Sequence, residues 1–287
     1  MRAVVFLCVV ASFAVPRHEA FGQTSGSQEP RKPGEGRAPI HPAPVQTYAS
    51  SELDRTLEKL PPNFKGHYIA LVYSTLEERK KESEKSEFET TEQWHQRQET
   101  LLPKPIIGRM TTGSIWAFVI LGVRSVYDAD NQVLQVYLPL EKLSSGRLAS
   151  DFRSMWAKLE STHSSYVGIN GFGAIAEVQS THDTIHHVAF GNAQAFTTAE
   201  NDFQAEVRVR VPCGPDAARQ MKPEVSALAV CRLTAPFTTS TYHSDTATVS
   251  YPYATQGEDN YVITELLELW IYDRRSGAIH VKLRPHD

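Results

Sequence analysis

The densest group of side chains with metal-binding chemistry lies in the segment His182-Asp183-x-x-His186-His187. Neutral imidazole is a common zinc ligand, and two histidines four residues apart share one face of a helix, as in zinc hydrolases. The glutamate of the H-E-x-x-H motif is missing, and in a strand His186 and His187 would point to opposite faces. The candidate metal ligands are therefore His182 and His186. Zinc is the alternative to a protein without a cofactor, and surface histidines are the structural alternative.

A second segment, residues 167–176 (VGINGFGAIA), is similar to the dinucleotide-binding fingerprint of glyceraldehyde-3-phosphate dehydrogenases. That fingerprint requires a helix directly after the glycines and an acidic residue about 20 positions later, which binds the ribose. Here the residues after Gly173 alternate as in a strand, and Gly191-Asn192 stands where the acidic residue belongs. We interpret the match as coincidental and expect a glycine-rich β-bulge or a close crossing of strands.

Motifs for nucleophilic catalysis and for calcium binding fail on spacing. No G-x-S-x-G or S-x-x-K motif is recognisable in the sequence. The run 242–245 (YHSD) holds the residue types of a serine-hydrolase triad, but neighbours along one strand or loop do not converge on one another. Asp128-x-Asp130-Asn131 begins like a calcium loop, but Val133 and Pro139 stand where its glycine and glutamate belong. The sequence therefore names no catalytic residue, and enzymatic activity is left open with a preference against it.

The first 22 residues have the features of an export signal. Met1-Arg2 is positively charged, residues 3–15 form an apolar run of 13, and Ala20-Phe21-Gly22 places small residues where a signal peptidase reads them. The run is too short to span a bilayer. We expect residues 1–22 to be cleaved, with an uncleaved anchor as the alternative, and no transmembrane segment to remain. The predicted location is periplasmic or secreted.

Two regions follow this signal. Residues 23–46 contain five prolines among glycine, serine and charged residues, which predicts a disordered linker. Residues 47–287 form the predicted globular region, with a candidate subdivision near residues 140–165. Cleavage would remove Cys8 and leave Cys213 and Cys231, 18 positions apart in an oxidising compartment. We therefore predict a Cys213–Cys231 disulfide, which would stabilise the fold by about 3 kcal/mol on the chain-entropy model.

Composition excludes several classes of protein. Hydrophobic residues make up 41% of the 287 and aromatic residues 9%, which is enough for a buried core and argues against wholesale disorder. The 29 basic and 33 acidic residues are interspersed and give a net charge of -4, so no basic stripe indicates a nucleic-acid partner. A mean hydropathy of -0.34 argues against a polytopic membrane protein.

Hydrophobic periodicity predicts an α+β fold, mainly antiparallel strands with a few short helices. The predicted helices cover residues 53–60, 90–101, 148–159 and 215–222, and residues 77–85 are a solvated helix or loop. Thr90 and Gln93 form a capping-box pattern at the start of the second helix. The predicted strands cover residues 67–76, 114–126, 133–138, 166–179, 185–190, 203–211, 225–233, 266–272 and 279–283. An Asx turn is expected at residues 127–131 and a polar turn at residues 180–184. The hairpin of residues 127–138 recurs at residues 272–283 with an offset of 145, which raises the hypothesis of two related strand-rich halves.

Three blocks carry a family resemblance: residues 87–97 (EFETTEQWHQR), 127–130 (YDAD) and 166–173 (YVGINGFG). In this order they resemble a set of exported bacterial proteins with "FETT...R", "YDAD" and "YVG-N-FG" blocks, over roughly residues 60–285. The resemblance implies a location in the bacterial envelope. It implies no activity and no functional residue, because no reaction or ligand is established for the set.

The leading functional hypothesis is a noncatalytic envelope module that binds another protein, a peptide or a cell-wall component. The competing hypotheses are a hydrolase whose site is assembled from residues distant in sequence, and a metal-binding protein. Titratable groups gathered in a deep cleft would favour the enzyme, whereas an apolar patch or an exposed sheet edge would favour the binding module.

Overall fold

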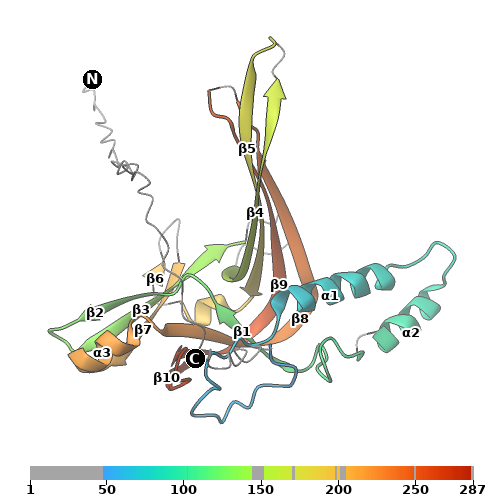
Figure 1. Ribbon diagram of the computed structural model, residues 1–287. Coiled ribbons are helices and arrows are strands. Elements are labelled where there is room, and N and C mark those ends of the chain that lie inside the picture. Colours follow the sequence, from blue (N-terminus) through green and yellow to red (C-terminus); the bar gives the residue numbers. More distant parts are fainter. Residues whose placement is uncertain are drawn as a thin grey trace, which may run out of the picture. The chain divides into compact units, whose positions relative to one another are not determined.

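Long strands form most of the structure, which is a computed structural model (Figure 1). It describes residues 48–101, 103–143, 152–169, 172–197, 199–200, 205–248 and 250–285. The predicted export signal and linker, residues 1–22 and 23–46, lie outside these residues. The predicted globular region, residues 47–287, is described from Tyr48 onward, and its described residues belong to one unit, Val45–Asp287.

The elements follow one another along the chain with few helices among many strands. In chain order they are α1 Ile69–Ser83, α2 Thr91–Leu101, β1 Ile115–Ile120, β2 Arg124–Asp128, β3 Val133–Lys142, β4 Arg153–Ile169, β5 Ile175–Phe190, the short 3₁₀ helix η1 Ala193–Ala195, β6 Ala199–Glu200, β7 Ala205–Pro212, α3 Pro215–Met221, β8 Val225–Asp245, β9 Tyr253–Asp273 and β10 Ile279–Leu283. No described helix is both long and apolar enough to cross a membrane.

The strands pair in the order β1-β8-β9-β5-β4-β3-β7-β6, with β10 beside β9 and β2 beside β3. Strands β5 and β9 run parallel, and the other pairs are antiparallel. The fold is therefore strand-rich with a mixed, mostly antiparallel sheet, as predicted. Near residues 140–165, where a subdivision was a candidate, Glu141 pairs with Ser154 and Lys142 with Arg153, so β3 is joined to β4.

Four strands extend beyond the rest of this unit as a long twisted arm (Figure 1). We define the arm as residues 159–169 of β4, 175–185 of β5, 239–245 of β8 and 253–261 of β9. The pairing of β5 with β9 starts only at Gln179 and Tyr253, whereas β4 and β5 pair out to Ile169 and Ile175. The end of the β4–β5 hairpin is thus a two-stranded ribbon beyond the reach of β9.

Binary patterning explains where the strands bury their side chains. In β7 the residues Val207, Val209 and Val211 are buried while Arg208 and Arg210 are exposed, the period of two that a half-buried strand requires. This confirms the predicted strand. The sheet packs against α1 through Ile69, Val72 and Leu76, each of which contributes about 1.5–3 kcal/mol by leaving water.

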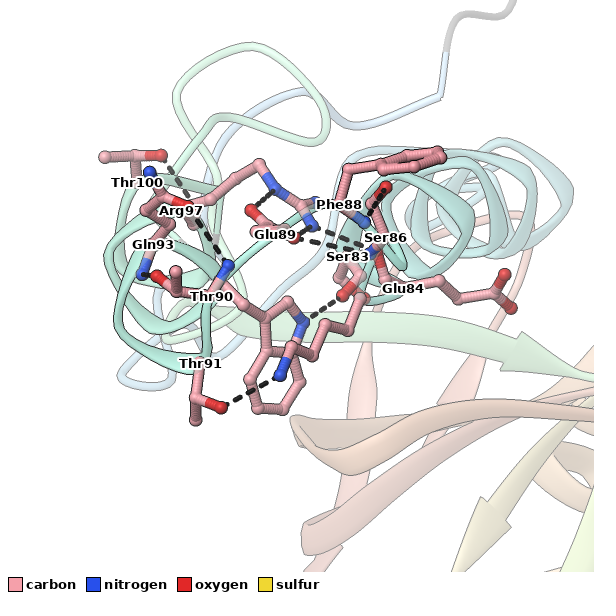
Figure 2. Close-up of polar contacts among 12 residues, drawn as sticks. Ser83, Glu84, Ser86, Phe88, Glu89, Thr90, Thr91, Gln93, Arg97 and Thr100 are labelled. Carbon is pink, nitrogen blue, oxygen red and sulfur yellow. Dashed lines mark hydrogen bonds and ion pairs between the residues drawn. The ribbon is translucent and has the colours of Figure 1, made fainter.

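The connection between α1 and α2 is held by side chains of the "FETT...R" block (Figure 2). Gln93 and Thr90 form the predicted capping box, because each side chain binds the backbone N–H of the other at 3.0 and 3.2 Å. Arg97 donates to both carboxylate oxygens of Glu89 at 2.9 and 2.6 Å. Trp94 Nε1 donates to Ser83 O at 2.6 Å, which ties α2 to the end of α1.

Two predicted elements have the wrong secondary structure. The predicted strand 67–76 is the first half of α1, because Ile69, Val72 and Leu76 recur at helical spacing and bury one face against the sheet. The predicted helix 148–159 is wrong from Arg153 onward, where β4 begins; residues 144–151 lie outside the described residues. Long-range pairing with β5 overrides the helical spacing of its apolar residues.

Two further predictions misplace local features. Residues 53–60 form no helix: Leu60 N instead donates to Gly277 O at 2.8 Å, which ties this segment to the turn before β10. The polar residues 180–184 were expected to form a turn, but they continue β5 without a break. The chain reverses earlier, after Ile169, so β4 and β5 are longer than predicted.

Candidate ligand-binding cleft

An open cleft of about 500 Å³ lies where the segment before α1 meets β1, β4 and the turn after β9. Ligand pockets in proteins have volumes of this order. We call it the aromatic-basic cleft, because its lining includes Tyr48, Lys65, Tyr68, Lys158, Arg274 and Arg275. These residues come from three separate parts of the chain, which the sheet and its flanking segments bring together.

His67 fixes the wall of the cleft to β1. The backbone N–H of Ala117 donates to His67 Nδ1 at 2.8 Å, and His67 Nε2–H donates to Ser51 O at 2.9 Å. Next to it, Gly66 has φ +64°, and a Cβ there would lie 2.5 Å from Ala117 O. A side chain at position 66 is therefore excluded both by backbone conformation and by space, and the wall approaches β1 closely.

Aromatic rings and lysines alternate in the cleft. The rings of Tyr48 and Tyr68 stack with centroids 4.6 Å apart and a tilt of 30°. Lys65 Nζ lies 5.5 Å from the Tyr48 centroid, and Lys158 Nζ lies 4.2 Å from the Tyr68 centroid and donates to the Tyr68 hydroxyl. Both lysines thus make cation–π contacts that hold their ammonium groups against aromatic surface.

Positive charge exceeds negative charge among the lining residues. Glu224 accepts from Arg275 at 2.6 Å and lies 3.4 Å from Arg274, so one carboxylate serves two guanidinium groups. Lys65 and Lys158 add two further cations to the lining, of which Lys158 forms an ion pair with Glu160 at 2.7 Å. In a chain with a net charge of -4, this cleft is a local positive site.

The titratable groups of the cleft are arranged for binding more than for proton transfer. Burial lowers the pKa of His67, against the effect of its backbone partners, and both ring nitrogens are occupied. Burial also lowers the pKa of Lys158, but hydrogen bonds with Glu160 and Tyr68 outweigh it and the net shift is upward. Lys158 is therefore protonated at neutral pH, and Glu224 is engaged in two ion pairs. A general base needs a free, neutral or anionic group at the ligand.

A separate network has the residue types of a catalytic triad. Ser154 Oγ lies 3.3 Å from His187 Nδ1, and His187 Nε2 lies 3.2 Å from Asp259 Oδ1, so β4, β5 and β9 bring together a serine, a histidine and a carboxylate. The ring of His187 stacks on Tyr261 at 4.5 Å. Ser154 is only 1% exposed, however, and a nucleophile must reach a substrate carbonyl. The network therefore has the residue types of a triad without an accessible nucleophile in this structure.

The structure does not bring His182 and His186 together. Both lie on the same face of β5, but four residues of extended strand separate their backbones by about 13 Å. His182 is exposed, whereas His186 is 5% exposed and packs edge-on against Tyr73. His187 faces the opposite side, as predicted. Among the described residues, no three His, Cys, Asp or Glu side chains form a group that could hold a metal ion.

Cys213 and Cys231 are free thiols in this structure. Cys231 lies in β8 within the core, where burial raises the pKa of its thiol to about 12. Cys213 follows β7 and is half-buried, with its backbone N–H bonded to Gln132 O at 3.0 Å. Their disulfide stays a prediction, which the intact mass of the exported protein tests: the bonded form is lighter by two hydrogen atoms.

The glycine-rich segment lies at the end of the arm. Gly168 belongs to β4 and Gly173 to the following turn, with φ +82°, while Asn170 and Gly171 lie outside the described residues. Strand β5 follows the glycines, where a dinucleotide-binding fold would have a helix. This agrees with our interpretation that the match to the dinucleotide-binding fingerprint is coincidental. The expected bulge or strand crossing is replaced by a hairpin turn.

No protein-family model, curated protein or solved structure matches the chain. The resemblance to exported bacterial proteins therefore stays a prediction. The candidate functional site is the aromatic-basic cleft, and none of its residues was a candidate from the sequence. Lys65, Lys158 and Arg275 are single cations in unrelated segments, and no spacing pattern connects them.

Proposed function

We propose that the protein is an exported, noncatalytic binding module of the bacterial envelope, and that its aromatic-basic cleft binds an anionic sugar of the cell wall. One observation carries the proposal: stacked aromatic rings and excess positive charge occupy the same cleft. A sugar ring packs its apolar face on an aromatic side chain, and a carboxylate pairs with lysine or arginine. N-acetylmuramic acid, a cell-wall sugar, carries both features in one molecule, and its carboxylate is free wherever no stem peptide is joined to it.

The cleft divides these two tasks among its residues. Tyr48 is exposed, and its ring, which contacts Tyr68 and lies near Lys65 Nζ, offers apolar surface to a sugar. Lys65 and Arg275 supply positive charge for the carboxylate of the sugar. Arg275 can do so because it shares the single carboxylate of Glu224 with Arg274, so the two guanidinium groups carry more charge than Glu224 neutralises. The affinity for an anionic sugar should fall as salt is added, because salt screens the exposed charges of the cleft.

The hydrolase alternative has the Ser154–His187–Asp259 network in its favour. A fluorophosphonate probe, which labels activated serines, tests it directly. We expect no labelling, because Ser154 is buried. Labelling that is lost in Ser154→Ala would replace the binding proposal with an enzymatic one.

The two strand-rich halves of an α+β fold remain part of the proposal. The two hairpins related by the offset of 145 have the same hydrogen bond in their turns. Asn131 N–H donates to Asp128 Oδ1 at 3.1 Å, and Ser276 N–H donates to Asp273 Oδ1 at 2.6 Å. Asx turns of this kind also arise independently. Related sequences that keep the offset would support duplication, and related sequences that lack one hairpin would contradict it.

Calorimetric titration tests the function. The protein is expected to bind N-acetylmuramic acid at least about tenfold more tightly than N-acetylglucosamine, which lacks the carboxylate; tenfold corresponds to about 1.4 kcal/mol. Lys65→Gln and Arg275→Gln should each remove most of that preference. Arg219→Gln, at an exposed ion pair on α3, is the matched control. Equal affinity for the two sugars, or variants without effect, would overturn the proposal.

A further inference from the structure

The end of the arm exposes large apolar side chains. Phe172 in the β4–β5 turn is 98% exposed, and Val167, Ile169 and Ile175 are each more than two-thirds exposed. Ile169 and Ile175 pair directly across the ribbon, and Val167 lies two residues further along, so the three share one face. Figure 1 shows this hairpin as the outermost part of the arm. We call these four residues the apolar tip.

The segments that form the end of the arm carry no charge. Residues 164–176 (SSYVGINGFGAIA) contain no Asp, Glu, Lys or Arg, and neither do residues 246–256 (TATVSYPYATQ). The two segments lie side by side, because Gln179 N–H donates to Pro252 O at 2.9 Å and a shallow groove is lined from both, including Ile169 and Ala247. In a chain that is 22% charged, such a charge-free end is unusual and is exposed to solvent.

Tyrosines lie inward of the apolar tip. Tyr166, Tyr251 and Tyr253 are all at least half exposed, and Tyr251 and Tyr253 contact each other with ring centroids 4.9 Å apart. Tyrosine has an apolar ring and a polar hydroxyl, which suits it to the level of lipid headgroups. Tyr166 pairs with Val178 and Tyr253 with Gln179, so both lie inward of the Ile169–Ile175 pair. Glu177, which pairs with Val167, is the first charged residue from the end.

We propose that the apolar tip inserts into the interface of a lipid bilayer. A narrow ribbon with Phe172 at its end fits between headgroups, and a shallow interfacial position leaves the unpaired backbone groups of its two outer edges in contact with water and polar headgroups. Glu177 pairs with Val167, so it marks the inward limit of the part that inserts, and Ile169, Phe172 and Ile175 lie beyond it. The absence of basic residues also distinguishes this mode from attraction to anionic lipid, so zwitterionic vesicles are expected to bind as well as anionic ones.

Depth-dependent fluorescence tests insertion directly. The full-length Phe172→Trp variant is mixed with phosphatidylcholine vesicles, and the wild-type spectrum is subtracted to remove the natural tryptophans. We expect a blue shift and quenching by lipids spin-labelled on the acyl chain. If the introduced tryptophan stays solvent-exposed while the protein binds vesicles through another segment, the proposal is overturned.

Vesicle sedimentation provides the second readout. The double variant Phe172→Asp/Ile175→Asp should bind vesicles at least about tenfold more weakly. Val126→Asp, at an exposed apolar residue on β2, is the matched control and should bind like wild type. Equal binding by both variants contradicts the proposal. A second result would also contradict it: the wild-type protein forms a concentration-dependent dimer and does not bind vesicles, and the double variant is a monomer. A second copy of the chain would then cover the apolar tip.

Discussion

His243 on β8 and Gly257 on β9 face each other, and the imidazole occupies the space that a side chain at position 257 would need. A Cβ on Gly257 would lie 2.2 Å from two atoms of the ring. In this position His243 Nδ1 lies 3.6 Å from Asp259 Oδ2, while the other oxygen of Asp259 meets His187. The glycine thus allows two histidines to share one carboxylate across three strands.

Gly257→Ala should therefore displace the His243 ring and destabilise the protein by about 1 kcal/mol, as overpacking does. The ring is half exposed and can swing outward, which limits the cost. In a His243→Ala background the same substitution should cost nothing or stabilise, because alanine restricts the unfolded chain. Urea unfolding of the four proteins measures the coupling. Equal costs in both backgrounds would show that the ring and the glycine do not compete.

Asp259→Asn should destabilise the protein by about 2 kcal/mol near neutral pH, because a charged hydrogen bond to His187 is lost. The pKa of Asp259 is lowered, chiefly by the His187 hydrogen bond and against burial. Its contribution is thus present above the ordinary value of 3.8 and is lost as the pH falls through the lowered pKa. Asp245→Asn, at an exposed site on β8, is the control. A difference between Asp259→Asn and wild type that persists in strong acid would contradict this account.

His186 should make stability depend on pH in the mildly acidic range. Burial lowers the pKa of His186 from 6.5 to about 4, helped by the positive charge of Lys158 and by His187 and opposed by Glu160. Below pH 6.5 the unfolded chain binds a proton that the folded protein does not, so stability falls as the pH drops towards about 4. The charge-free Tyr73 ring is the neighbour on α1.

The variant His186→Phe should remove about 2 kcal/mol of the loss between about pH 7 and about pH 5. Buried His67 and half-buried His280, whose pKa values are also lowered by burial, keep part of the slope. His182→Gln, at an exposed histidine on the same strand, should leave the slope unchanged. Urea unfolding at the two pH values measures the effect. A slope that His186→Phe and His182→Gln alter equally would refute the assignment.

The helix connection in Figure 2 depends on the paired contact between Arg97 and Glu89. Lysine lacks the planar fork that meets both carboxylate oxygens in parallel, so Arg97→Lys should speed hydrogen exchange of the α2 amides several-fold. Arg219→Lys, in an exposed pair with Asp216 on α3, is the matched substitution and should not affect α2. Unchanged exchange in α2 would mean that the other contacts, from Trp94 to Ser83 and from Lys85 to Thr91, hold the connection without this pair.

Local signals predicted the elements whose contacts are local. The capping box of α2, the alternation of Val207 and Arg208 in β7 and the Asx turn at Asp128 all depend on residues within four positions of each other. The start of β4 could not be predicted in this way. Residues 153–159 have helical spacing, but their structure is decided by β5, about 30 positions away.

The cleft was out of reach for a similar reason. Nothing in the sequence marks the four cleft residues as a group: Tyr48, Lys65, Lys158 and Arg275. They come together only because the segment before α1 packs on β1 and on the turn after β9. The two candidate metal ligands show the reverse relation, because His182 and His186 are close in sequence but lie about 13 Å apart along an extended strand. Proximity along the chain predicts a shared site only where the secondary structure is known.

A crystal structure of the protein grown with N-acetylmuramic acid would show whether the aromatic-basic cleft holds the sugar. We expect the sugar ring against Tyr48 and the carboxylate about 3 Å from Lys65 Nζ or the Arg275 guanidinium. A sugar bound elsewhere on the protein, or a cleft that stays empty at saturating concentration, would contradict this expectation.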